Sequence, residues 1–281
     1  MKKVVVVSNC TTKYMVDTCR QIFPGTFKIT GCPFYTIKHR QKLNSTLDLL
    51  GDADIIITAF HHKHQFEELH TVNIKKRFPN KKIIVFPSMW FKGENPYIML
   101  NKNINGPLLT YHDTRIITMW VNKKITMLNY NSKHMQIALE KSSVDIASRE
   151  QMCDVLMTDM LKEYPNQRLF TTYHHPSRFL LVQSVRKFCS CLGIEPNAPK
   201  DTFGTGEHEI GVQTPCIYDK PNHLFSVNRA TGHREDGNPE CELSDSIYDI
   251  NQVIEMYFEF YDKVTGADKD WLLSRQKVRY G

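Results

Sequence analysis

The sequence has no run of about 18 apolar residues, the length that a membrane-spanning helix needs. Charged residues interrupt every long apolar segment, so we expect no transmembrane segment. The apolar stretch Val4-Val5-Val6-Val7 follows two lysines but stops at Ser8, which makes it too short for a signal peptide. It predicts a buried strand instead, and the chain is expected to be soluble.

The chain also lacks the cysteine spacing of zinc sites and redox motifs, because none of its eight cysteines forms a CxxC pair. Scattered cysteines in a long chain without a signal peptide favour reduced thiols, and so a cytoplasmic protein. His61-His62-Lys63-His64 has the composition of a metal site, but no clear carboxylate or thiol accompanies it, and no metal is expected. Gly204-Thr205-Gly206-Glu207 is not a dinucleotide-binding fingerprint, because no strand signal precedes it and no helix signal follows it.

A strong basic patch is absent as well. The formal net charge of +6 is spread along the chain, and its densest cluster is Lys75-Lys76-Arg77 with Lys81-Lys82. No aromatic residues alternate with these charges, so the cluster indicates a solvated helix end and turn rather than a nucleic-acid surface. We expect no nucleic-acid partner, and the pattern leaves the oligomeric state open.

Strand and helix patterns alternate along the first hundred residues. This alternation is typical of an open parallel sheet with crossover helices. We therefore predict an α/β fold, with a parallel α/β subdomain of about four strands over residues 1–100. The predicted strands cover residues 4–7, 27–30, 54–60 and 82–87, and the predicted helices cover 11–22, 36–50 and 66–77.

Residues 101–281 are predicted to form a mainly helical subdomain that packs with the first as one unit. The helices of this half show apolar residues at helical spacing and recognisable start signals. Residues 197–243 are instead rich in Gly, Pro and Asp and show no periodicity, so we expect a lid or a substrate loop there. Three helices are expected, one from a capping box at Ser148 and Gln151, one from Ser177 to Gly193, and one over 246–264.

Cys10 stands in the predicted strand-to-helix turn at the carboxyl end of the first strand. Open α/β sheets bind ligands at that edge. The unpaired amides and the positive end of the following helix are expected to lower the pKa of this thiol and to stabilise an oxyanion beside it. A small buried thiol that only fills the turn is the structural alternative.

His175 directly precedes Pro176, so it is biased toward an extended conformation at the point where a loop meets a helix start. The adjacent pair His174-His175 could equally be ordinary loop polarity. With Cys10 as a nucleophile, however, His175 forms a Cys and His pair suited to acyl transfer.

A third segment contains His112, Asp113 and Arg115. These side chains could orient a catalytic group or hold a phosphate, and Asp113 is the candidate for a third catalytic residue. The alternative is a loop tied by a salt bridge between Asp113 and Arg115.

Five segments occur in an order that points to a known family. They are Ser8-Asn9-Cys10-Thr11, residues 86–93 (FPSMWFKG), 106–113 (GPLLTYHD), 168–194 (from RLFTTYHHPS to LGI) and 214–218 (TPCIY). With them the chain resembles, over nearly its full length, the WcbI-type family of capsular polysaccharide biosynthesis acetyltransferases. In this chain Ser8, Thr11 and His174 replace the Gly, Gln and Asn of the family motifs, whereas Cys10 and His175 are retained.

The resemblance implies that the chain binds coenzyme A, takes acetyl-CoA as donor substrate and O-acetylates a saccharide. In that reaction Cys10 would be the nucleophile or would help to hold the oxyanion, and His175 would be the general base. An apolar groove with Trp90, Phe91 and Tyr111 suits the pantetheine arm. Cations such as Lys92, Arg115 or Arg178 suit the phosphates. The expected coenzyme A contacts are Asn9, Thr11, Trp90, Lys92, Tyr111, His112, Arg115 and Arg178.

Two other functions stay open at this point. A thiol hydrolase with the same pair of Cys10 and His175 would release an acid without a sugar acceptor. A non-catalytic glycan- or nucleotide-binding protein would use Cys10 only as a structural residue.

Overall fold

The computed structural model describes residues 1–128, 132–197, 225–226, 229–233, 239–242 and 247–275. These residues divide into two compact units. Of the described residues, the first unit contains 1–90, 143–169 and 175–197, and the second contains the remainder. The division into subdomains over residues 1–100 and 101–281 that pack as one unit stays a prediction.

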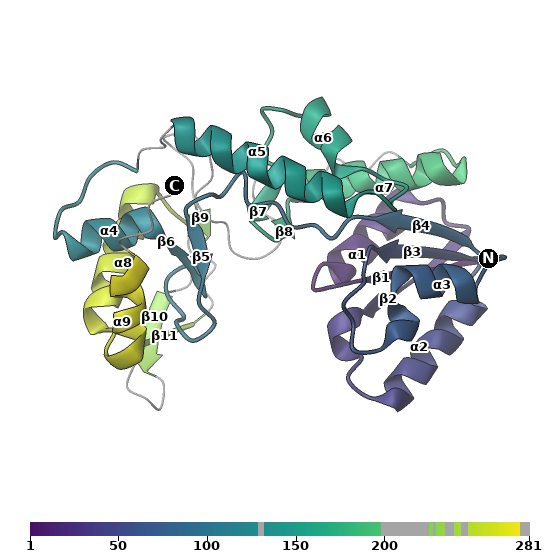
Figure 1. Cartoon of the computed structure of the whole chain (residues 1–281), viewed down its shortest axis with the longest axis horizontal. Coiled ribbons are helices and arrows are strands. Elements are labelled where there is room, and N and C mark those ends of the chain that lie inside the picture. The colour runs from purple at the N-terminus through teal and green to yellow at the C-terminus, as the bar shows by residue number, and fades with distance from the viewer. Residues whose placement is uncertain (129–131, 198–224, 227–228, 234–238, 243–246, 276–281) are drawn as a thin grey trace. The chain divides into compact units, whose positions relative to one another are not determined.

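The first unit is built on a four-stranded parallel sheet with the strand order β2-β1-β3-β4 (Figure 1). The central strands are buried on both faces, as the continuous apolar run Val4-Val5-Val6-Val7 requires. The predicted α/β fold with about four parallel strands is thus confirmed. The strands are β1 (Lys2–Ser8), β2 (Phe27–Pro33), β3 (Ile55–Ala59) and β4 (Lys82–Phe86).

Three helices connect these strands. Because β-α-β crossovers are right-handed, α1 lies on one face of the sheet, and α2 and α3 lie on the other (Figure 1). Two of them start later than the sequence predicts, because the short 3₁₀ turns η1 (Phe34–Thr36) and η2 (Glu67–Leu69) precede them. The helices are α1 (Thr12–Ile22), α2 (Arg40–Asp52) and α3 (Thr71–Arg77).

The helix predicted from a capping box at Ser148 is wrong. Helix α5 (Ser132–Arg149) ends there, and the Ser148 hydroxyl donates to the Asp145 carbonyl at 2.7 Å, within the last turn of that helix. Helix α6 (Met157–Glu163) begins later, and the buried carboxylate of Glu150 accepts from its first backbone N–H groups. That carboxylate comes from a turn seven residues ahead of Met157, a spacing that no capping-box pattern contains.

Helix α7 (Arg178–Leu192) confirms the prediction for its segment. The Ser177 hydroxyl caps its N-terminus by accepting from the Leu180 N–H at 3.2 Å, and Gly193 ends it with a left-handed φ of 63°. The helix packs against α1, and the two-residue strand β8 (His175–Pro176) leads into it.

The second unit has a core of aromatic and aliphatic side chains around α8 (Ile250–Lys263). Asp249 and Gln252 form a capping box at the start of α8, so the predicted last helix is confirmed with a start four residues later than residue 246. The helical C-terminal half is confirmed in α8 and in α9 (Gly266–Arg275). The other elements of this unit are α4 (Thr114–Val121), β5 (Ile98–Leu100), β6 (Tyr111–Asp113), β7 (Phe170–Thr172), β9 (Phe225–Ser226), β10 (Arg229–His233), β11 (Pro239–Glu242) and β12 (Ile247–Tyr248).

Most of the predicted lid or substrate loop over residues 197–243 lies outside the described residues, as do the Gly204-Thr205-Gly206-Glu207 and 214–218 segments. Within the described part of the chain, no helix combines the length and the apolar character that crossing a membrane requires.

Candidate active site

Cys10 lies in the turn between the end of β1 at Ser8 and the start of α1 at Thr12. This turn is at the carboxyl edge of the parallel sheet, where open α/β folds bind ligands. The Cys10 thiol is exposed, so it does not fill a gap in the core. The structural alternative of a buried thiol that plugs the turn is therefore wrong.

The Cys10 thiol faces the imidazole of His175. The distance from Cys10 Sγ to His175 Nε2 is 3.6 Å, which is within hydrogen-bonding range for sulfur, although 165 positions separate the residues in sequence. Both belong to the first unit, and the packing of α7 against α1 accounts for their approach, because His175 lies just ahead of α7 and Cys10 just ahead of α1. A proton can pass directly between these two side chains.

The pKa values of Cys10 and His175 shift in opposite directions, and each shift favours the neutral form of its group. Partial burial raises the pKa of the Cys10 thiol, and the backbone N–H groups of Cys10 and Thr11 offset this rise only in part. Burial also lowers the pKa of the His175 imidazole. The prediction that the helix start lowers the thiol pKa is therefore wrong in its net direction, because desolvation outweighs the nearby amides. At neutral pH the pair is a thiol beside a neutral imidazole.

Asn9 and Thr11 organise the turn around Cys10. The Asn9 side-chain oxygen accepts from the Thr11 N–H at 3.1 Å and from the Thr11 hydroxyl at 3.0 Å. The Asn9 carbonyl accepts from the Thr12 N–H at 3.1 Å and from its hydroxyl at 2.7 Å. The predicted ligand residue Thr11 is buried, and its hydroxyl serves this network.

A cavity of about 530 Å³ opens at the carboxyl ends of β3 and β4, and we call it the Trp90 cavity. Strand β3 lies between β1 and β4, so the cavity and Cys10 are at the same edge of the sheet. The side chain of Trp90 is 52% exposed. The residues that line the cavity are Phe60, His61, His62, Lys63, Ser88, Trp90, Asp145 and Arg149.

Arg149 holds the backbone that presents Trp90. Its guanidinium donates to the Ser88 carbonyl at 2.7 Å, to the Trp90 carbonyl at 2.6 Å and to the Asp145 carboxylate at 2.8 Å. Sequence reasoning found Trp90 but missed Arg149 and Asp145. Both lie on α5, where Ile146 is the only buried residue among those described, so the helix carries no clear apolar stripe.

The histidines after β3 have local partners. The His61 ring stacks on Phe34 with a centroid distance of 4.4 Å, and burial lowers the pKa of His61 to about 4. His64 accepts from the Phe66 N–H, and the His70 ring bonds the His64 carbonyl at 3.0 Å. Within the described ranges, no group of three His, Cys, Asp or Glu side chains is arranged to hold a metal ion.

Asp113 and Arg115 belong to the second unit, where they form the salt bridge that the sequence offers as an alternative. The Arg115 guanidinium donates to both carboxylate oxygens, at 3.0 and 2.6 Å, and lies over the Tyr97 ring. Asp113 also caps α4 by accepting the Arg115 N–H at 2.9 Å. A catalytic role for Asp113 and a ligand contact for Arg115 stay predictions.

His112 is fully buried in the second unit and its two ring nitrogens have fixed roles. Its Nε2 lies 3.2 Å from the Ile104 carbonyl, which can only accept, so Nε2 carries the proton and donates. Its Nδ1 then accepts from the Tyr261 hydroxyl at 3.0 Å. Burial lowers the pKa of His112 to about 4. A coenzyme A contact for His112 stays a prediction.

The three remaining predicted contacts have different surroundings. In the second unit, the buried Tyr111 hydroxyl lies 3.0 Å from His174 Nε2, and the half-buried Lys92 has a pKa that burial lowers. In the first unit, Arg178 donates to the side-chain oxygen of Gln21 on α1 at 3.3 Å. The structure thus brings Cys10, His175, Asn9 and Thr11 together, and it places Tyr111, His112, Asp113 and Arg115 in the other unit.

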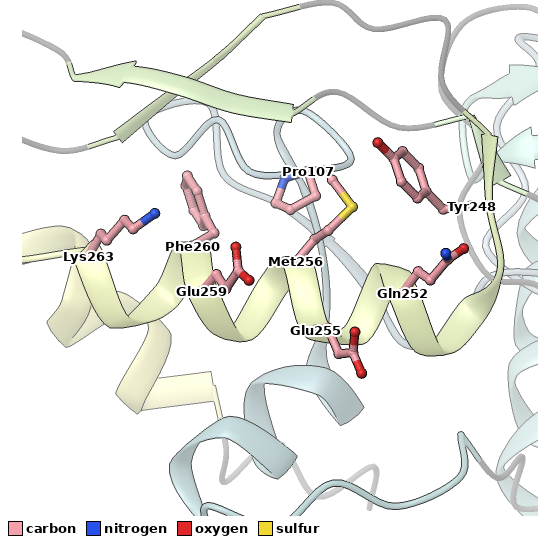
Figure 2. A pocket seen from close by; sticks show the side chains of 8 residues that line it. All are labelled: Pro107, Tyr248, Gln252, Glu255, Met256, Glu259, Phe260 and Lys263. Carbon is pink, nitrogen blue, oxygen red and sulfur yellow. The ribbon is translucent and has the colours of Figure 1, made fainter.

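Another cavity, of about 380 Å³, lies in the second unit along α8 (Figure 2). Figure 2 shows Met256 and Phe260 on the side of the helix that faces Pro107. None of the described residues that line this cavity is a predicted site residue.

Comparison with known proteins relates the chain to one family of enzymes. A family model described as polysaccharide biosynthesis enzyme WcbI matches residues 3–197. A solved structure of WcbI, described as the native protein without a disulfide bond between coenzyme A and one of its cysteines, is similar over 99% of this chain and 96% of that chain. Its TM-score is 0.66 and its sequence identity is 14%, so this likeness shows the fold. No curated protein matches the chain. Since the family model covers more than half of the sequence, the chain belongs to the WcbI family of polysaccharide biosynthesis enzymes.

Proposed function

We propose that this chain is an acyl-CoA-dependent O-acyltransferase that acetylates a saccharide hydroxyl in capsular polysaccharide biosynthesis. The observation that carries the proposal is the 3.6 Å approach of Cys10 Sγ to His175 Nε2 at the ligand-binding edge of the sheet. Membership in a family of polysaccharide biosynthesis enzymes supports it. The description of a similar structure in terms of coenzyme A and a cysteine supports the donor.

In the first half of the proposed reaction, the Cys10 thiol gives its proton to His175 Nε2 and its sulfur attacks the thioester carbon of acetyl-CoA. The bond from that carbon to the coenzyme A sulfur then breaks, and the leaving thiolate takes the proton from His175. The products are acetyl-Cys10 and free coenzyme A. Because one thioester replaces another, this exchange costs little free energy.

In the second half, the saccharide hydroxyl gives its proton to His175 Nε2 and its oxygen attacks the acetyl carbon. The bond to Cys10 Sγ breaks, and the sulfur recovers the proton from His175. A direct route is the alternative, in which His175 activates the hydroxyl for attack on acetyl-CoA itself while Cys10 helps to hold the oxyanion. An acetylated Cys10 forms only on the first route.

The predicted ligand contacts are parts of the same proposal. The exposed indole of Trp90, on a backbone that Arg149 holds, suits a flat or apolar ligand face at the same edge as Cys10. Lys92, Arg115 and Arg178 are the proposed partners of the coenzyme A phosphates, and Asp113 is the proposed third catalytic residue.

Calorimetry with coenzyme A and mass spectrometry with acetyl-CoA test the proposal together. We expect binding of coenzyme A, and in the absence of a saccharide we expect one added acetyl group on the peptide that contains Cys10. Cys10→Ala should abolish the acetylation. Cys191→Ala removes another accessible thiol of the first unit and should leave it unchanged, so it is the matched control.

Two outcomes contradict the proposal. No binding of coenzyme A at a concentration of about 1 mM would remove the acyl-CoA donor. Steady release of acetate from acetyl-CoA with Cys10 present, at a rate that no saccharide changes, would identify a thiol hydrolase instead.

A further inference from the structure

The side-chain amide of Asn9 has a defined orientation beside Cys10. One of its two terminal atoms lies 3.1 Å from the Thr11 backbone nitrogen. A backbone N–H can only donate, so this atom must be the oxygen Oδ1 and not the nitrogen. The Thr11 hydroxyl, 3.0 Å from the same oxygen, donates to it as well.

A buried chain of hydroxyl groups holds this orientation. The single proton of the Thr11 hydroxyl points to Asn9 Oδ1, so the contact of 3.2 Å between the Ser8 and Thr11 hydroxyls must be a donation from Ser8 to Thr11. Ser8 and Thr11 are each 1% exposed, and successive hydrogen bonds of this kind strengthen one another away from water.

The orientation leaves the two N–H groups of Asn9 Nδ2 available. Among the described residues, Nδ2 has no hydrogen-bond acceptor. Asn9 Oδ1 lies 3.9 Å from Cys10 Sγ, and Nδ2 shares a carbon with Oδ1, so Nδ2 is within roughly 6 Å of the sulfur. The oxygen of an acyl group bound to Sγ is two bonds from that sulfur, which places it within reach of Nδ2.

The backbone N–H groups of Cys10 and Thr11 differ in whether they already donate a hydrogen bond to an oxygen. The Thr11 N–H already donates to Asn9 Oδ1. Both N–H groups lower the pKa of the Cys10 thiol, but in the described part of the chain the Cys10 N–H donates to no oxygen. Of the two, the Cys10 N–H is therefore the one available to a reacting group.

We propose that Asn9 Nδ2, together with the backbone N–H of Cys10, donates hydrogen bonds to the oxyanion that forms when Cys10 attacks an acyl carbon. Fixed donors aimed at developing negative charge stabilise the transition state more than the ground state. This inference rests on the proposed function, since it assigns a catalytic role to Asn9 in the same site.

Asn9→Asp separates this role from the structural role of Asn9. An aspartate keeps the oxygen that accepts from Thr11, so the turn is retained, but it has no N–H to donate. We expect acylation of Cys10 by p-nitrophenyl acetate to slow by about 100-fold or more, the effect of removing one such donor. Asn44→Asp, on the exposed face of α2, introduces the same charge elsewhere in the first unit and is the matched control.

Alkylation of Cys10 by iodoacetamide is the second measurement, because it develops no oxyanion. The aspartate charge raises the thiol pKa, so the two variants are compared at the plateau that the alkylation rate reaches at high pH, where the thiol is fully ionised. We expect this plateau to be unchanged in Asn9→Asp. An acylation rate within about threefold of the wild type at the same degree of ionisation would overturn the inference, because one oxyanion donor is worth much more. An equal loss in the alkylation plateau would also overturn it, since Asn9 would then only position the sulfur.

The ester used separates this inference from the proposed function. If p-nitrophenyl acetate acylates Cys10 and acetyl-CoA does not, the covalent route from acetyl-CoA through Cys10 is wrong, whereas the Asn9→Asp comparison still decides the role of Asn9. If neither ester acylates Cys10 in the wild type, the inference about Asn9 is wrong, whereas calorimetry with coenzyme A still tests the acyl-CoA donor.

Discussion

Replacing His175 by Ala is expected to slow Cys10 acylation strongly at pH 7 and much less at high pH. His175 Nε2 is 3.6 Å from Cys10 Sγ and is the group positioned to take the thiol proton. Burial raises the thiol pKa above its ordinary value of 9.0, so the wild-type protein needs a base to form the nucleophile at neutral pH. Without the imidazole, only thiol that has already ionised in water can react.

The size of the effect follows from the thiol pKa. At pH 7 a thiol with a pKa of 9.0 is ionised to about 1%, and the Cys10 thiol is ionised less than that. We therefore expect a loss of about 100-fold or more at pH 7, which is within the range for a positioned general base. As the pH rises through the thiol pKa, the thiolate forms without help, and the rates of the variant and the wild type should converge.

The assay is the release of p-nitrophenolate from p-nitrophenyl acetate between about pH 5 and 10, with Cys10→Ala as background. The pKa of His175 is lowered by burial, so its imidazole stays neutral below 6.5, and wild-type activity should persist there until the pH falls through that lowered pKa. His39→Ala, which removes an exposed imidazole ahead of α2, is the matched control. A loss in His175→Ala that is the same at every pH, or no loss at pH 7, would refute the reasoning.

Three further predictions concern stability. Gly31→Ala should destabilise the first unit by about 1–3 kcal/mol in urea unfolding, because the Cβ of the new alanine would lie 2.9 Å from the Val16 side chain on α1. An unchanged urea midpoint would show that α1 moves to make room without cost. Asp113→Asn should destabilise the second unit by about 3 kcal/mol, because it removes the negative charge of a buried ion pair with Arg115, whose side chain is 11% exposed; a variant as stable as the wild type would contradict this. Neutral His112 should stabilise the folded protein above pH 6.5, and the free energy of unfolding should fall by up to about 3 kcal/mol as the pH drops toward 4. The reason is that the unfolded chain binds the proton at a higher pH than the folded chain does. The same fall in His112→Gln would rule out His112 as its source.

Local patterns in the sequence predict the sheet and the position of Cys10. Continuous apolar runs mark β1, β3 and β4, and the switch from the valines of β1 to helical spacing places Cys10 in the turn. The cap at Ser177 and the left-handed Gly193 likewise mark the ends of α7, because each depends on its own neighbours in the chain. Where a more distant residue makes the cap, as Glu150 does for α6, the pattern predicts the wrong boundary.

Tertiary structure decides what Cys10 can do. The helix start alone predicts a lowered thiol pKa, but the protein that surrounds the turn desolvates the thiol and reverses the net direction. The partner imidazole of His175 comes from a segment 165 positions away. Strand and helix signals depend on neighbours along the chain and are therefore readable in the sequence, whereas the chemistry of a site depends on distances and on solvent exclusion, which exist only after distant segments have packed together.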